Sequence, residues 1–299
     1  MKIIAPFELT GAMLTSSTVP ENDHAEWAAG TAYTAGQKVI RLTTHKIYEA
    51  LTASTGKVPE DSPTDWLDLG ATNRWAMFDQ KVGTSTTATT SMTYVFAVGQ
   101  IVQAIGFMEL SNVTSINVTV TDSVDGEVYN TTKTLASTLF ASNWWHYFFD
   151  PIQRRTVLYF TDLPSYRNAA ISITITGDSG ATIGCGVCMI GRYYEFADAV
   201  RIGASIGIQD YSRKEVDDWG NYEIIERAFA KRANWDLWVD RPRMDLLFTT
   251  LASLRAKPAL YIGGEIEDAT TVYGFPKDWD VVIEYPFYVQ CSIDLEGLI

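Results

Sequence analysis

Hydrophobic and polar residues alternate with a period of two through the middle of the chain. In the stretch 115–121 every second residue is Ile or Val and the others are Ser, Asn or Thr, and residues 170–176 repeat this pattern. Such alternation predicts strands with one buried and one exposed face. The Asp125-Gly126 pair that follows the first stretch is typical of a hairpin turn. Over residues 71–200 we therefore expect an antiparallel β-sandwich of jelly-roll type.

The C-terminal third of the chain changes to a mixture of strands and one helix. After Pro242, the residues of one helix face recur at helical spacing: Leu246, Leu247, Thr250, Leu251 and Leu254. Short apolar runs around this helix predict five strands: 206–212, 235–239, 259–262, 280–285 and 288–294. Residues 223–230 fit either a strand or a short helix. We expect a small α+β domain over 201–299.

An aromatic-rich segment precedes the sandwich. Four rings, separated by glycines and a proline, fit no helical period: Trp27, Tyr33, Tyr48 and Trp66. This pattern predicts short strands joined by tight turns, with the rings supplying the core. We expect a small β module over 24–70, preceded by a polar, extended N-terminal arm over 1–23. The chain as a whole is therefore predicted to be mostly β, with one helix near its C-terminus.

Composition and charge narrow the class of protein. The chain has 299 residues, of which 46% are hydrophobic and 20% charged, and this suffices for two or three ordered domains. A net charge of −13 argues against a nucleic-acid surface, which needs clustered Lys and Arg. No apolar run approaches the roughly 20 residues that a membrane span requires. The first residues, with Pro6 and a single Lys, do not fit a signal peptide, which predicts a product of the cytoplasm.

Cys185 and Cys188 form a C-x-x-C pair, a pattern that suggests redox chemistry or a zinc site. They lie in an apolar, strand-like run with no second pair of Cys or His nearby. Buried strand residues are therefore the favoured interpretation over metal or redox chemistry. Because there are only three cysteines, no disulfide framework is expected, and this fits folding in a reducing compartment. We expect neither a metal nor a cofactor.

Candidate catalytic residues are few. The histidines are divided between the small module and the sandwich, which does not favour a catalytic triad or a His-rich metal site: His24, His45 and His146. Two acidic pairs could be proposed for glycoside hydrolysis: Asp122 with Asp125, and Asp217 with Asp218. Both pairs lie in turn-like segments, where Asp is favoured for local hydrogen bonds. We expect that the protein is not an enzyme.

Residues 144–149 read Trp-Trp-His-Tyr-Phe-Phe, and this aromatic run needs a separate explanation. If the run is a strand, neighbouring side chains point to opposite faces, so the rings cannot all enter one core. Aromatic side chains are enriched at protein interfaces. We therefore hypothesise that part of the run is buried against a neighbouring subunit, with four candidate residues: Trp144, Trp145, Tyr147 and Phe149.

The aromatic module reads Trp27-x5-Tyr33-x2-Gly36-x2-Val39, then Tyr48-x-Ala50, Gly56, Pro59 and Trp66. This spacing resembles the chitin-binding type 3 family of carbohydrate-binding modules. The resemblance implies a small β fold in which the four aromatic residues match mainly core positions, and it makes the same four the candidate glycan-binding residues. In that family, two Trp residues after the second Tyr stack on sugar rings, whereas this chain has Thr52 and Ala53. This departure favours a spacer or docking module over a sugar-binding one.

Strings near both ends of the chain carry a second resemblance. The first, Asn73-Arg-Trp-Ala-Met-Phe-Asp79, directly follows the small module, and the others are 273–279, 283–286 and 295–299. Together they resemble a group of tail-tip and baseplate proteins of tailed bacteriophages, in which a chitin-binding-like module precedes a β-sandwich. Within the first string, Trp75, Met77 and Phe78 are expected in the core, on the first strand of the sandwich.

The second resemblance implies a structural role. It predicts a protein made in the host cytoplasm and located in the virion tail, where it self-associates as a trimer or hexamer. Its partners would be other tail, baseplate or fibre proteins. The alternative is a glycan-binding protein that recognises a host surface receptor from the same tail tip.

Overall fold

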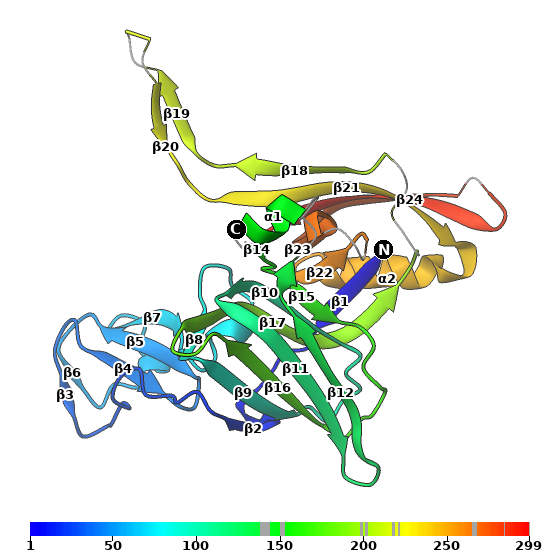
Figure 1. Ribbon diagram of the computed structural model, residues 1–299. Coiled ribbons are helices and arrows are strands. Elements are labelled where there is room, and N and C mark those ends of the chain that lie inside the picture. Colours follow the sequence, from blue (N-terminus) through cyan, green and yellow to red (C-terminus); the bar gives the residue numbers. More distant parts are fainter. Residues whose placement is uncertain are drawn as a thin grey trace. The chain divides into compact units, whose positions relative to one another are not determined.

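The computed structural model of the chain describes residues 1–137, 144–149, 153–197, 200, 203–216, 219–220, 222–264, 268–283 and 285–298. It is 53% strand and 11% helical, which confirms the mostly β fold expected from the sequence. The chain forms two compact units (Figure 1). The sandwich unit is Glu8–Cys188, and the C-terminal unit combines Met1–Phe7 with Met189–Ile299.

Eight strands form the two sheets of the sandwich unit. They are β8 (Thr86–Thr89), β9 (Ser91–Ala97), β10 (Ala104–Ser111), β11 (Val113–Asp122), β12 (Gly126–Thr134), β15 (Leu158–Phe160), β16 (Ala170–Gly177) and β17 (Thr182–Glu195). One sheet has the order β8-β17-β10-β15 and the other β9-β16-β11-β12. Consecutive strands therefore change sheet at every connection except β11–β12, which is the jelly-roll arrangement. The predicted sandwich type is confirmed.

The register between β11 and β16 explains why these two sequence stretches alternate. Ile116 pairs with Ile175, and Val118 with Ile173, and all four side chains are buried. The intervening Thr and Asn residues occupy the other face of the same sheet. Gly126 begins β12 with a positive φ of 76°, which a glycine adopts readily after the turn.

Shorter elements complete the sandwich unit. They are β2 (Leu14–Ser17) beside β9, the pair β13 (Ala136–Ser137) and β14 (Gln153–Arg154), the helix α1 (Trp144–Phe149), and the 3-10 helices η1 (Gly11–Met13) and η3 (Ala76–Phe78). The expected first strand of the sandwich at Trp75–Phe78 is thus wrong, because η3 occupies this position. The strand considered for residues 144–149 is also wrong, since they form α1.

The small module contains a three-stranded sheet and a two-stranded pair. The sheet has the order β4-β5-β7, and β3 pairs with β6. The bounds are β3 (Ala32–Tyr33), β4 (Lys38–Arg41), β5 (Lys46–Ala50), β6 (Ser54–Thr55), η2 (Pro59–Asp61) and β7 (Trp66–Ala71). Short strands and turns therefore form this segment, as its glycines and aromatic residues predict.

One antiparallel sheet organises the C-terminal unit. Its order is β17-β1-β22-β23-β24-β21-β18. Besides the second half of β17, the strands are β1 (Lys2–Pro6), β18 (Ser205–Asp210), β21 (Phe229–Asp240), β22 (Ala259–Ile262), β23 (Thr271–Val282) and β24 (Tyr288–Gly297). The helix α2 (Met244–Leu254) follows η4 (Arg241–Arg243), and η5 (Asp268–Thr270) precedes β23.

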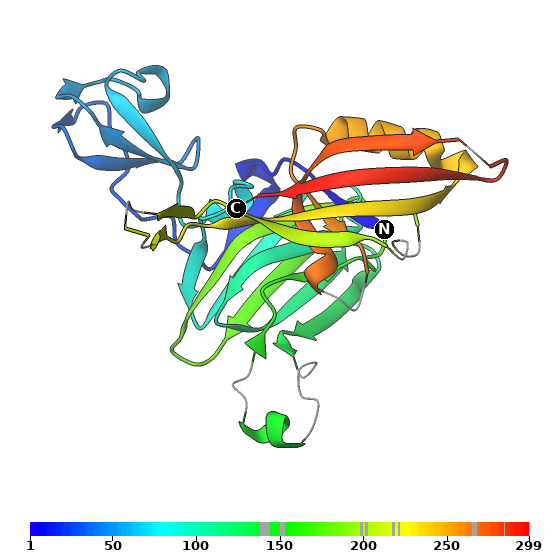
Figure 2. The ribbon, with the colours of Figure 1, turned by 90° about the horizontal axis from the view of Figure 1, so that it is seen from above.

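The predicted helix covers one face of this sheet (Figure 2). Leu247, Leu251 and Leu254 are buried in one cluster with Trp235 of β21. Leu246 lies on the other side of α2 and is 51% exposed. The apolar stripe of the sequence is therefore the face that packs against the strands, and it is one residue narrower than predicted.

The first seven residues differ from the expected arm. Residues 2–6 form β1, which pairs with β17 on one side and with β22 on the other. Ile3 and Ile4 are completely buried, so this segment is a central strand. The predicted boundary at residue 200 is also displaced, because the two units divide within β17, between Cys188 and Met189. One continuous strand contributes to both units, and no change in sequence pattern marks the division.

Candidate functional site

Three of the four candidate glycan-binding residues lie in the core of the small module. Tyr33, Tyr48 and Trp66 are no more than 8% exposed and form one cluster, against which Trp27 packs. The rings of Tyr33 and Trp66 meet edge to face at 5.2 Å. A sugar stacks on an exposed ring face, which these buried rings do not offer. A glycan-binding role therefore does not fit the burial of these three residues, whereas Trp27 is only partly buried.

Trp27 is also covered on its outer side. The Arg41 guanidinium lies 4.9 Å from the centre of the Trp27 ring. Two hydrogen bonds of 2.7 and 3.0 Å to Glu60 hold Arg41 there. These bonds lower the pKa of the Glu60 carboxyl below its ordinary value. At the position of the missing sugar-stacking residues, Thr52 donates a hydrogen bond to Asp65, so this part of the module is polar.

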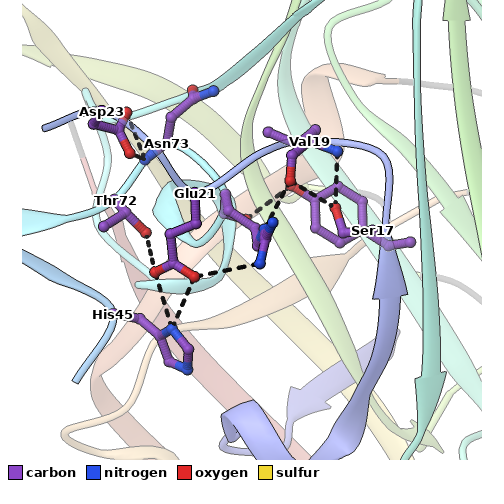
Figure 3. A network of polar contacts seen from close by, with 9 residues as sticks. Ser17, Val19, Glu21, Asp23, His45, Thr72 and Asn73 are labelled. Atoms are coloured by element: carbon purple, nitrogen blue, oxygen red, sulfur yellow. Dashed lines mark hydrogen bonds and ion pairs between the residues drawn. The ribbon is translucent and has the colours of Figure 1, made fainter. Parts of the chain in front are cut away.

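A buried carboxylate lies where the small module meets the sandwich strands (Figure 3). The Glu21 side chain is 3% exposed. Its Oε1 atom accepts hydrogen bonds from His45 at 3.0 Å and from Thr72 at 2.9 Å. Its Oε2 atom accepts a third hydrogen bond from Arg74 at 3.4 Å. His45 belongs to the small module, Thr72 directly follows β7, and Arg74 lies in the segment before η3. Glu21 therefore connects these three segments.

The string Asn73–Asp79 completes this junction. The Asn73 side chain donates to the Thr87 carbonyl at 2.9 Å and accepts from the Thr87 amide at 2.8 Å, which secures it to β8. Met77 is completely buried, and the Phe78 ring contacts the Tyr94 ring edge to face. The core role expected for these residues agrees with the structure. The string replaces a flexible linker with a packed connection between module and sandwich.

The aromatic run forms an exposed surface on α1. Trp144, Trp145, Phe148 and Phe149 are between 66% and 77% exposed. They form two ring pairs at i,i+4 spacing: Trp144 stacks on Phe148, and Trp145 contacts Phe149 with tilted planes. The side chains of His146 and Tyr147 lie outside the described residues. An exposed aromatic cluster of this kind is typical of a binding surface, and the subunit interface predicted for this run stays a prediction.

A second exposed apolar surface lies on a hairpin that the sequence does not single out. Strands β19 (Arg213–Val216) and β20 (Tyr222–Ile225) pair with each other. They extend the β18–β21 ribbon away from the other strands of the C-terminal unit (Figure 1). Every residue of both strands is exposed. We call β19, β20 and the described residues between them the β arm.

The β arm exposes large apolar side chains. Val216 and Tyr222 are opposite each other in the hairpin and are 56% and 71% exposed. Ile224 shares their face and is 64% exposed, and Trp219, near the tip, is 89% exposed. A two-stranded hairpin has marginal stability in water. Such an arm gains stability when a neighbouring protein covers its apolar side chains.

A polar hollow of about 520 Å³ lies on the open face of the C-terminal sheet. Its charged side chains come from three strands: Arg232, Lys277, Asp294 and Glu296. Lys277 forms an ion pair with Glu296 at 3.2 Å, and Asn234 donates a hydrogen bond to Asp294. Because Lys277 and Asn234 pair with the two carboxylates of the hollow, it does not point to a particular ligand.

The residues considered for chemistry do not assemble into a site. Cys185, Cys188 and Cys291 are buried free thiols, and burial raises their pKa. Asp122 accepts hydrogen bonds from the amides of its own turn, and Asp217 and Asp218 lie outside the described residues. Within the described ranges, no three His, Cys, Asp or Glu side chains are placed to hold a metal ion.

Comparison with protein-family models, with curated proteins and with solved structures finds no match for this chain. None of the helices in the described part of the chain combines the length and the apolar character needed to span a bilayer.

Proposed function

We propose that this protein is a structural component of a bacteriophage tail tip or baseplate, which self-associates and docks neighbouring tail or fibre proteins. Its role is architectural and not catalytic. The residue strings at 73–79 and at the C-terminal end resemble those of phage tail proteins, and the exposed surfaces suggest that the protein binds neighbouring subunits. In this proposal the protein is made in the host cytoplasm and resides in the virion.

The observation that carries this proposal is the β arm. An isolated, fully exposed hairpin that presents Val216, Tyr222 and Ile224 to solvent is stabilised when another protein buries it. The α1 aromatic cluster is a second surface of the same kind. The rigid junction at Glu21 also fits an architectural role, because it holds the small module against the sandwich.

Two measurements test the proposal. Sedimentation equilibrium of the purified chain should give a mass that is a multiple of 33.3 kDa. Immunogold labelling of particles from the phage that encodes this chain should place the label at the tail tip. A monomeric mass contradicts self-association, and unlabelled tails contradict the proposed location.

A variant of the β arm separates its role from general effects on folding. Val216→Ser with Ile224→Ser should reduce assembly while leaving the thermal transition of the monomer within a few degrees, because both side chains are exposed. Val124 is 87% exposed in the β11–β12 turn, and Val124→Ser is the matched control. If both variants assemble like the parent chain, the β arm is not an assembly surface.

The alternative, a glycan-binding receptor-recognition protein, has less support because three of its four candidate residues are buried in the core of the module. Retention of the full chain on chitin or on a glycan array tests it. Trp66→Ala should unfold the module instead of selectively removing retention. Strong retention that is lost in a folded Trp27→Ala variant would favour the alternative.

A further inference from the structure

The strand β18 is an edge that lacks the usual protection. Among the described strands it pairs only with β21 and ends the sheet order of the C-terminal unit. Natural edge strands are commonly protected by Lys, Pro, bulges or a covering segment. The sequence of β18 is Ser-Ile-Gly-Ile-Gln-Asp, in which the last residue alone is charged. Such an edge is a template for pairing with another strand.

The pairing of β18 with β21 determines the side to which each β18 residue directs its backbone N–H and C=O groups. The Tyr211 amide donates to the Ala228 carbonyl, immediately beyond the β18–β21 register. Because alternate residues of an antiparallel strand direct their amides to opposite sides, Gly207 and Gln209 also direct theirs toward β21. The backbone N–H and C=O groups of Ile206 and Ile208 therefore point to the open edge.

The side chains along this edge have a consistent arrangement. Ile206 is directly opposite Ala233, a member of the core cluster beneath α2. Ile208 is opposite Lys231. Ile206 and Ile208 are 44% and 58% exposed, so this face of the sheet ends on β18 in two exposed isoleucines. Gly207 and Gln209 face the other side, which is the polar face. A further strand here would extend both faces of the sheet.

We propose that β18 pairs antiparallel with β18 of a second copy of this chain, about a two-fold axis at Gly207. This inference rests on the proposed self-association and identifies one strand, besides the β arm, through which two copies contact each other. Ile206 and Ile208 of one copy are then opposite Ile208 and Ile206 of the other. Both of these symmetric pairs exchange N–H···O=C bonds, and the two C-terminal sheets become one continuous sheet.

Self-complementarity identifies a second copy as the occupant. With the axis at Gly207, the two glycines form the close, non-hydrogen-bonded pair, where the absence of side chains permits close approach. Ser205 is then opposite Gln209 of the second copy, and Asp210 is opposite Ala204. Among the residues of the two β18 strands, no like charges are opposite each other and every Ile is opposite an Ile. A shift of the axis to Ile208 would instead place Asp210 opposite Ile206.

The symmetry of this contact limits the assembly. A two-fold contact uses the same strand on both copies and produces even-numbered closed assemblies. It fits a hexamer built from three pairs, or a simple dimer, but it cannot by itself build a trimer. Of the trimer and the hexamer that the sequence suggests, the proposed pairing therefore favours the hexamer.

Disulfide cross-linking tests the register. In this pairing, residues 205 and 209 of opposite copies have Cα atoms about 4.5 Å apart, which a disulfide spans. A Ser205→Cys/Gln209→Cys chain treated with a mild oxidant should migrate at twice the mass of one chain. Ser205→Cys alone should remain single, because its equivalent in the second copy is four residues away along the strand. The parent chain should also remain single, since its three cysteines are buried.

Sedimentation tests the contribution of the edge. Ile208→Lys should weaken association by at least roughly tenfold, because it places a charge opposite Ile206 of the second copy. Ile208→Pro removes the outward amide but no amide that β21 needs, so it should weaken association without disturbing the ladder. Val124→Lys is the control for an added charge at an exposed Val. Circular dichroism should show that all three variants keep the native fold.

The outcomes separate this inference from the proposed function. If the parent chain is monomeric at all concentrations, the self-association and this inference both fail. If it is oligomeric but the double-cysteine chain does not cross-link, the Gly207 register is wrong while self-association stands. If Ile208→Lys and Ile208→Pro associate like the parent chain, β18 is not the contact.

Discussion

The imidazole of His45 stacks on the indole of Trp75, with ring centroids 4.4 Å apart and planes 24° from parallel. His45 belongs to the small module, and Trp75 to the string that leads into the sandwich. The same imidazole contacts the buried carboxylate of Glu21. This stacked pair, with its carboxylate, makes the module an integral part of the sandwich unit.

Glu21→Gln should destabilise the sandwich unit by about 1–3 kcal/mol, because an amide nitrogen replaces one of the oxygens that accept hydrogen bonds. Urea unfolding followed by tryptophan fluorescence measures the change. Glu26 is exposed, and Glu26→Gln should lie within about 0.5 kcal/mol of the parent chain. Equal stability of the two variants would show that the Glu21 network is not important for the junction.

Gly11→Ala tests the packing on the other side of His45. A Cβ atom at residue 11 would lie within 2.4 Å of the His45 Nε2 atom, and the ring is held by Glu21 and Trp75. We expect a loss of about 1–3 kcal/mol from overpacking. Gly30 has open space around its Cα atom, so Gly30→Ala should be neutral or slightly stabilising. A neutral Gly11→Ala variant would show that His45 can move away at little cost.

Ile3→Ala tests whether the first residues are a core strand. Ile3 is completely buried in the C-terminal unit, and truncation of such a side chain typically costs about 2–5 kcal/mol. Differential scanning calorimetry should show a lower transition temperature for that unit. Leu42→Ala, at a 42% exposed position, is the control and should have a small effect. If both variants melt like the parent chain, residues 1–7 are a dispensable arm.

The Arg41–Glu60 pair predicts a pH dependence of the small module. Hydrogen bonds from Arg41 lower the pKa of Glu60 below its ordinary value of 4.5. The folded module therefore stabilises the charged form of Glu60 more than the unfolded chain does. This contribution to stability is fully present above pH 4.5 and decreases as the pH falls through the lowered pKa. For a partly exposed pair we expect about 0.2–1 kcal/mol.

Stability measurements between pH 6 and pH 3, with tryptophan fluorescence as the signal, check this effect. Glu60→Gln should remove the part of the pH dependence that comes from this carboxyl. An unchanged pH profile in Glu60→Gln would show that the pair does not contribute.

Thiol reactivity tests the burial of the C-x-x-C pair. Burial raises the pKa of Cys185 and Cys188, and raises that of Cys291 to about 12, so all three remain protonated at pH 8 and are shielded from solvent. Ellman's reagent should react slowly with the native chain and with three thiols after unfolding. Val124→Cys adds a thiol at an 87% exposed position and should react at once in the native state. Rapid reaction of the parent chain would favour a redox or metal role.

Local pattern determined much of the secondary structure. The alternation in 115–121 and 170–176 predicts β11 and β16, because one face of each strand must be apolar to reach the core. The helix after Pro242 follows from leucines at helical spacing. The jelly roll could also be predicted, since many short alternating strands with turns between them have few alternative arrangements.

Other elements depend on long-range contacts and could not be predicted from local pattern. Residues 2–6 are too few to show a period, and β1 is a strand because β17 and β22 provide partners on both sides. The run 144–149 contains rings that suit either a strand or a helix, and its local sequence could not decide between them. The bounds of the two units depend on contacts among segments that are far apart in the chain.

For the candidate surfaces too, local sequence pattern predicts one part and long-range contacts decide the rest. The spacing of Trp27, Tyr33, Tyr48 and Trp66 predicts a module with these rings in its core. Only the tertiary structure shows that Tyr33, Tyr48 and Trp66 are too deeply buried to offer a ring face to a sugar. The exposed β arm and the open edge of β18 leave no local signature, because exposure depends on what the rest of the chain covers. The sequence by itself determined which segments can form strands and helices, since this depends on neighbouring residues. The tertiary structure decided which apolar side chains are buried and which remain exposed for a partner, because burial depends on contacts between distant residues.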